Sequence, residues 1–238
     1  MTGPSEALRS IALGGQTIPY VLYRGRRRTI GLSIDHRGLR VGAPTRAGLG
    51  EIEALLEKHG AWVLDKLDVW RQRQTAGTFA IHDGASLPWL GGELRLLLKN
   101  GANRATWTDD GGALALSVAP GTSPQMILER ALRQRVRVLL AARLTRLAAV
   151  LGVPTPPLAL SSARTRWGSC NSRGAIRLNW RLGFFGLPVI DYVVAHELAH
   201  LKEMNHGPRF WSVVESLCPE WRLRRAELKQ ISLRLPLF

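Results

Sequence analysis

The chain has 238 residues, of which 45% are hydrophobic and 21% charged, so it can bury a full core as one large domain or two small ones. No apolar run approaches the roughly 18 residues that a membrane helix requires, which excludes a membrane-spanning protein. Lysine and arginine number 33 against 18 aspartates and glutamates, and the net charge of +15 predicts an anionic partner, either a phosphate-rich small molecule or nucleic acid.

Residues 1–120 are predicted to form a β-rich N-terminal region with two helices. β-Branched and aromatic residues between turn signals predict a small antiparallel meander, with strands at 18–23, 29–35 and 39–44. Between residues 48 and 74 apolar residues recur at helical spacing, and Gly60 divides this segment into two helices. Further strands are expected between 80 and 119, on either side of a polar, glycine-containing stretch.

The second half, residues 121–238, has a helical composition, so we place a domain boundary near residue 120. From Ser123 to about Leu151 apolar residues share one helical face, and the prolines of VPTPPL end this helix. The segments that follow are predicted to be a strand at 175–182, a helix from Pro188 to Met204, and one or two helices within 208–232. The pattern predicts an α+β fold, and no internal repeat is visible that would indicate a solenoid.

Three of the six histidines lie in one short stretch, VVAHELAHLKEMNHGPRFW, at residues 193–211. On a helix with about 3.6 residues per turn, His196 and His200 lie on the same face and can direct a nitrogen at one ion. Glu197 lies beside this pair without stacking on it, which suits a carboxylate that acts on a metal-bound water. This is the chemistry of the H-E-x-x-H motif.

A catalytic zinc takes three protein ligands and keeps one position open, so a third ligand is expected. His206 can return to the first two histidines if the helix ends before it, and Asn205 and Gly207-Pro208 tolerate such a reversal. The alternative third ligands are the downstream glutamates Glu215, Glu220 and Glu227. We therefore expect one Zn²⁺ per chain, although imidazole also accepts other divalent metals.

The segment TRWGSCNSRGAIRLNWRLGFFGLPVIDYVVAHELAHLKEMNHGPRFW (165–211) closely resembles the YgjP-like metallopeptidase family, relatives of the SprT-like zincins. The earlier YRGRRRTIGLSIDHRGLRVGAP resembles the N-terminal region of that family. The resemblance implies a zincin-like α+β catalytic half, with His196, His200 and His206 as zinc ligands and Glu197 as the catalytic carboxylate. The histidine spacing equals that of metzincins, but Glu203 replaces their glycine and no methionine follows Met204 to form their Met-turn.

The default reaction is peptide-bond hydrolysis by the metal-activated water. The strand at 175–182 precedes the active-site helix, as the edge strand does in zincins, and an extended substrate could pair with it. Members of the resembled family have been described as UTP pyrophosphatases, which makes nucleoside triphosphate hydrolysis the alternative. Guanidinium groups suit phosphate oxygens, and the candidates for substrate binding are Arg164, Arg166 and Arg209.

A second alternative is a DNA-associated protease, as in SprT-like relatives. The arginine-rich helix at 128–146 would then contact phosphates, together with Arg222, Arg224 and Arg225.

The remaining motif residues are expected to be structural. Trp167 and Trp180 are expected to pack in the core rather than stack on a base. The two cysteines, Cys170 and Cys218, are too few for a disulfide framework, and Cys170 is expected to be an inert thiol. The N-terminal sequence lacks the features of a secretory signal, so a cytoplasmic location is expected.

Overall fold

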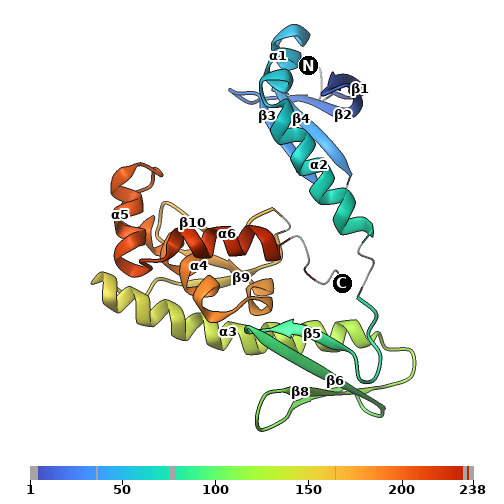
Figure 1. Ribbon diagram of the computed structural model, residues 1–238, viewed down its shortest axis with the longest axis vertical. Coiled ribbons are helices and arrows are strands. Elements are labelled where there is room, and N and C mark those ends of the chain that lie inside the picture. Colours follow the sequence, from blue (N-terminus) through green and yellow to red (C-terminus); the bar gives the residue numbers. More distant parts are fainter. Residues whose placement is uncertain (1–4, 36, 76–78, 164, 233–234, 236–238) are drawn as a thin grey trace. The chain divides into compact units, whose positions relative to one another are not determined.

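The computed structural model describes residues 5–35, 37–75, 79–163, 165–232 and 235, and the chain divides into two compact units, Met1–Gly77 and Thr78–Phe238 (Figure 1). Both units contain helices and strands, and the eight strands β1 to β8 precede residue 120, which confirms the predicted α+β fold with a β-rich first half. Among the described residues, no helix combines the length and the apolar character needed to cross a bilayer.

The first unit is a four-stranded sheet that packs against two helices. Its elements are β1 (Ser5–Leu13), β2 (Gln16–Gly25), β3 (Gly31–Asp35), β4 (Gly38–Pro44), α1 (Leu49–Lys58) and α2 (Gly60–Thr75). As predicted, the segment forms two helices, and the break between them falls at His59, directly before Gly60. Alternate strand residues and the inner faces of both helices form one core, which includes the fully buried Val41, Ile52, Leu56 and Val63.

The strand order of this sheet, β1-β2-β4-β3, differs from the predicted meander. Strand β4 lies between β2 and β3 and runs parallel to β2, and β1 was not predicted. The reason is that an alternating pattern determines which face of a strand is buried, but not which strand becomes its neighbour.

The second unit begins with another four-stranded sheet. Its elements are β5 (Ser86–Trp89), β6 (Gly92–Asn100), β7 (Arg104–Trp107) and β8 (Ala113–Val118), followed by the long helix α3 (Pro124–Leu151). Figure 1 shows α3 running alongside this sheet. The inward residues of β6 and β8 share one hydrophobic core with the apolar face of α3. The boundary therefore lies at residues 77 and 78, and not near 120 as predicted, because burial of these strands depends on α3.

The two sheets share one topology. The second has the order β5-β6-β8-β7, with the same parallel and antiparallel neighbours as the first. Each begins with a hairpin whose two turn residues have positive φ, namely Gly14 (54°) and Gly15 (76°) in one and Leu90 (50°) and Gly91 (90°) in the other. The chain thus contains a structural repeat that was not visible in the sequence, because equivalent buried positions share apolar character more than identity.

The rest of the second unit carries the histidine motif. Its elements are β9 (Leu158–Ser161), β10 (Gly168–Cys170), β11 (Ile176–Asn179), η1 (Trp180–Phe184), α4 (Leu187–Ala199), α5 (Pro208–Leu217) and α6 (Trp221–Ile231). The predicted strand at 175–182 is β11, but it ends at Asn179, whose side chain accepts a hydrogen bond from the Arg181 amide and caps the 3-10 helix η1. In the order β10-β11-β9, β11 is the central strand, so its prediction as an edge strand is wrong.

A partly buried ion pair joins α4 to α3. Asp191, with 17% of its side chain exposed, accepts hydrogen bonds from Arg143, at 2.6 Å from Nε, and from Arg146, at 2.9 Å from Nη2. We expect Asp191→Ala to lower the free energy of unfolding by about 1–3 kcal/mol, because it leaves the half-buried Arg143 without its acceptor. Urea denaturation of the zinc-loaded protein measures this change.

The control is Glu215→Ala, which removes an exposed ion pair with Arg222. It is expected to change stability by less than about 0.5 kcal/mol. Equal effects of the two substitutions would show that Asp191 does not fasten the helices together.

Candidate metal centre

Helix α4 carries His196, and His200 is its C-cap residue. Pro188 lies in its first turn, where a missing N–H removes no intrahelical hydrogen bond. The helix ends at Ala199, earlier than the predicted end at Met204, and the amides of Lys202 and Glu203 both donate to the Ala199 carbonyl. Because the regular helix stops just before His200, the chain can turn back within a few residues.

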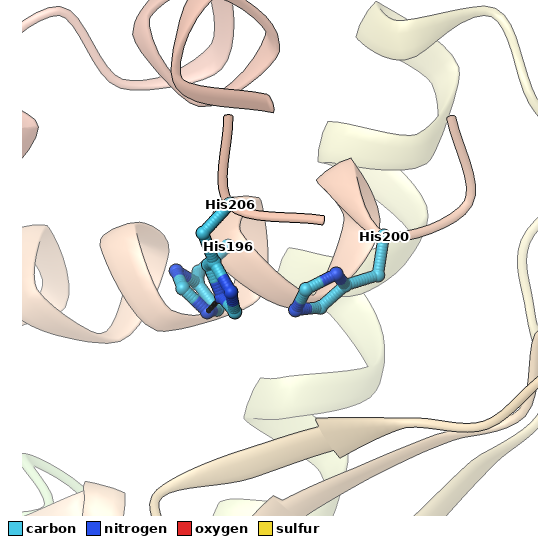
Figure 2. A group of neighbouring side chains, drawn as sticks. All are labelled: His196, His200 and His206. Carbon is cyan, nitrogen blue, oxygen red and sulfur yellow. Dashed lines mark hydrogen bonds between the residues drawn. The ribbon is translucent and has the colours of Figure 1, made fainter. Parts of the chain in front are cut away.

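This reversal brings His206 to the other two imidazoles. Ring centroids are 5.2 Å apart for His196 and His200, 5.0 Å for His196 and His206, and 4.9 Å for His200 and His206. One nitrogen of each ring lies within 4.8 Å of the others, and Figure 2 shows His200 turned toward the other two rings. The structure thus brings together the three histidines that the spacing singled out.

The rival glutamates are engaged elsewhere. Glu215 pairs with Arg222 at 2.9 Å, and Arg224 pairs with Glu220 and, at 3.2 Å, with Glu227. Within the described part of the chain, the group of potential ligands around His196 contains histidines and no glutamate.

The protonation of the rings suits metal coordination. Nδ1 of His200 lies 3.3 Å from the Glu203 carbonyl and donates to it, which leaves the Nε2 lone pair free. Burial, followed by the charges of His200, His206 and Arg225, lowers the pKa of His196 to about 4, so this imidazole is neutral at pH 7. Nε2 of His196 faces Nε2 of His206 at 3.2 Å. Three converging imidazole nitrogens fit a zinc ion or a similar divalent metal.

Glu197, which follows His196 on α4, has a buried side chain. The residue is 5% exposed, and burial raises the pKa of its carboxyl group to about 7, an effect that the charge of Arg166 partly offsets. A Cβ at Gly168 of β10 would lie 2.6 Å from Cγ and 2.7 Å from Cδ of Glu197. The absence of a side chain at Gly168 therefore makes room for the carboxylate, a role that sequence reasoning did not assign to the WGSC motif.

Gly168→Ala is expected to reduce turnover by about 10²-fold, because the methyl group must displace the Glu197 carboxylate and a displacement of about 1 Å can cost that much. Zinc content should not change, since the three atoms nearest to a Cβ at this position all belong to Glu197. Steady-state kinetics on whichever substrate proves active, with zinc determined by mass spectrometry, measures both quantities. Gly50→Ala is the control, because nothing lies within 4 Å of a Cβ at that glycine. Full activity of Gly168→Ala would contradict this placement of the carboxylate.

Phe210 provides the packing surface for the three imidazoles. Its fully buried ring lies 4.9 Å from His196, 4.7 Å from His200 and 4.6 Å from His206. Trp211 lies 5.9 Å from the His196 ring and stacks on Trp221 at 4.2 Å. Sequence reasoning missed this role of Phe210, although an aromatic residue four positions after His206 and within the following helix was a usable signal.

The predicted substrate-binding arginines are only partly placed. Arg164 lies outside the described residues, and Arg209 is exposed in the first turn of α5. Arg166 is exposed and close enough to Glu197 to lower the pKa of that carboxyl group. Arg225, predicted only as a nucleic-acid contact, lies 5.3 Å from the Trp211 ring, and its charge contributes to the lowered pKa of His196. Two exposed guanidinium groups thus act electrostatically on the site.

The remaining structural predictions agree with the structure. Trp180 is fully buried, and Trp167 packs edge-on against Phe185 at 4.9 Å, so both belong to the core as expected. Burial and the nearby Glu197 raise the pKa of the Cys170 thiol. A protonated thiol is a poor nucleophile, which agrees with the inert role predicted for Cys170.

A buried carboxylate beside three converging imidazoles is the arrangement of a metal-dependent hydrolase. The family described as "YgjP-like, metallopeptidase domain" matches residues 28–231, and the chain belongs to this metallopeptidase family. The match includes the first unit from residue 28 onward and most of the second unit, and it confirms the resemblance seen in the sequence.

Two solved structures are similar to part of the chain. The metallopeptidase zymogen abylysin of Pyrococcus abyssi is 22% identical, with a TM-score of 0.37 over 42% of this chain and 99% of its own. The zymogen jannalysin of Methanocaldococcus jannaschii is 19% identical, with a TM-score of 0.33 over 37% of this chain and 94% of its own. No curated protein matches the chain.

Proposed function

We propose that this chain is a zinc-dependent peptidase in which His196, His200 and His206 hold the ion and Glu197 is the catalytic carboxylate. The observation that supports this proposal is the convergence of three imidazole nitrogens within 4.8 Å next to a buried glutamate. When bound, zinc acts as a Lewis acid and lowers the pKa of a water molecule at its open position to about 7.

The protein side chains supply orientation and proton transfer. His200 is oriented by its hydrogen bond to the Glu203 carbonyl, and all three rings pack on Phe210. Glu197 would accept the proton of the attacking water on its carboxylate and pass it to the leaving amine. Gly168 supports this role because it leaves space for that carboxylate alone.

A peptide substrate would bind along β10. This strand lies at one edge of the three-stranded sheet, packs against α4, and carries Gly168 next to Glu197. An extended peptide could add to the free edge through backbone hydrogen bonds, which would place its carbonyl groups near the carboxylate. In this proposal the edge strand that pairs with the substrate is β10, and not the segment at 175–182 that the sequence predicted.

Hydrolysis of a nucleoside triphosphate such as UTP is the second candidate function. It is favoured by the exposed Arg166, near Glu197, and by Arg225, whose charge reaches His196. The guanidinium groups of these two residues could bind phosphate oxygens.

A nucleic-acid-associated protease has less support from the structure. Arg222 and Arg224, two of the predicted phosphate contacts, are paired with glutamates, and Arg225 lies over Trp211. The net charge of +15 still predicts non-specific attraction to DNA. DNA affinity that falls steeply with salt would support this function, and absent or salt-insensitive binding would remove it.

The deciding experiment compares the zinc-loaded protein with its Glu197→Gln variant on two substrate sets, a panel of unfolded proteins and peptides and a panel of nucleoside triphosphates. Peptide cleavage that disappears in the variant supports the peptidase. Release of phosphate or pyrophosphate that disappears in the variant would replace it with the nucleotide hydrolase. Turnover of neither set above the variant would count against both as the main activity.

A further inference from the structure

The open face of the first sheet has a hollow where two glycines pair. Tyr23 of β2 pairs with Gly42 of β4, and Gly42 pairs with Gly31 of β3. Because neither glycine projects a side chain, a pocket of about 250 Å³ remains, with Tyr23 on one side and the neighbouring pair Ser33 and Arg40 on the other.

Arg27 lies in this hollow. A Cβ at Gly31 would be 2.6 Å from its Nη2 atom, and a Cβ at Gly42 would be 2.8 Å from its Cζ atom. Neither glycine has a positive φ, so the backbone conformation does not require glycine at these positions. Glycine is required because the Arg27 guanidinium occupies the space that a Cβ would need. Side chains at 31 and 42 would expel Arg27 from the sheet surface.

The donors of Arg27 are available to a ligand. Arg27 is exposed, and no hydrogen bond or ion pair of its side chain exists within the described residues. Arg24 differs, because its guanidinium is used internally and donates to the Ala47 carbonyl at 2.6 Å. Arg40 pairs with Glu6 at 3.3 Å, and both side chains are partly exposed, so an incoming anion can compete with this weak pair.

The second sheet shows that the hollow does not follow from the strand order. The equivalent row of that sheet is Lys99, Ser117 and Arg104, each of which carries a side chain. The same topology therefore occurs once with a glycine pair under an arginine and once without it.

We propose that this pocket of the first unit, which contains none of the three histidines, binds a phosphate group. The guanidinium of Arg27 can bind two phosphate oxygens, while Arg40 and the Ser33 hydroxyl lie at the rim. A volume of about 250 Å³ is below the roughly 300–1,000 Å³ of sites that enclose a whole ligand, so one phosphate group enters and the rest of the molecule stays outside. The exposed Arg26 and Arg28 extend the positive charge, so the phosphate can belong to a small molecule or to a nucleic-acid strand.

The test uses the zinc-loaded full chain at low ionic strength with two probes, inorganic phosphate by calorimetry and a fluorescein-labelled oligothymidylate by anisotropy. Arg27→Ala removes the donor, and Gly42→Ser introduces the residue that the second sheet has at this position. Both should weaken binding by about tenfold, the loss expected for a charge-assisted contact. Arg46→Ala is the matched control, because it removes an exposed arginine of the same unit outside the pocket, and it should change affinity by less than about twofold.

Glu6→Gln should tighten binding, because it frees Arg40 and removes a carboxylate that repels the phosphate. A gain in affinity cannot result from misfolding, so this variant separates loss of the site from loss of the fold. If the pocket variants weaken phosphate binding, the site takes small phosphorylated molecules. If they weaken oligothymidylate binding, it takes a nucleic-acid strand. Either result supports the proposal. If Arg27→Ala and Gly42→Ser bind both probes as tightly as Arg46→Ala, and Glu6→Gln brings no gain, the pocket is not a phosphate site.

Discussion

Glu197→Gln is expected to lower kcat by about 10²–10⁴-fold, the usual contribution of a positioned general acid–base group, while zinc content and stability remain close to those of the parent protein. Glutamine has nearly the same shape, so it fits beside Gly168, but its amide cannot accept the proton of the attacking water. The residue is buried on α4 and directly follows His196, so a smaller side chain would also disturb packing. Steady-state kinetics together with zinc determination separates these effects.

The matched control is Glu215→Gln, which makes the same chemical change at an exposed glutamate paired with Arg222. It should retain full activity and zinc. If Glu197→Gln kept kcat within a few-fold of the parent value, another group would have to carry the proton, and the proposed role of Glu197 would be wrong.

His206→Ala is expected to remove zinc as completely as His196→Ala does. Loss of this imidazole leaves two nitrogens, from His196 on α4 and from His200 at the C-cap of that helix, and two ligands cannot complete the coordination of a stable site. Loss of a hydrogen-bond partner of a metal ligand typically lowers metal affinity by about 10–100-fold. Loss of the ligand itself should lower zinc affinity by more than this. Titration against a chromogenic chelator measures the affinity. Thermal unfolding with and without zinc gives an independent measurement, because a metal that binds the folded state raises the melting temperature.

His82→Ala controls for general loss of a histidine, since this ring is exposed in the same unit and contacts the neighbouring Asp83 carbonyl. Glu220→Ala tests a rival ligand directly and should leave zinc binding unchanged. Unchanged zinc affinity in His206→Ala, accompanied by a loss in Glu220→Ala, would assign the third position to that glutamate.

The metal centre could be predicted from the sequence because its geometry is mostly local. His196 and His200 share a face by helical periodicity alone, and Asn205 with Gly207-Pro208 marks the reversal that returns His206. The limits of α3 were predictable for the same reason, since Pro124 opens the helix and Gly152, in the left-handed conformation, follows its end. That these histidines bind zinc stays a prediction for the titration above.

Residues that act on the site from other elements could not be predicted in this way. Gly168 limits the space around Glu197 from a strand that joins α4 only in the folded chain, and no local pattern relates the two positions. Arg225 lies on α6, contacts the Trp211 ring and contributes to the lowered pKa of His196. A peptide-binding edge was expected at residues 175–182, but β11 is paired on both sides and β10 forms the edge.

By itself, the sequence determined the α+β class, most helices and strands, the histidine motif and the family, because periodicity, turn residues and motif spacing are properties of short segments. Only the tertiary structure decided that β4 lies between β2 and β3, that the units separate at residue 77, and that Arg27 lies on a pair of glycines. An alternating strand has a defined buried face but several possible neighbours. The choice among them follows from long-range packing, whose free energy depends on the whole core rather than on any one segment.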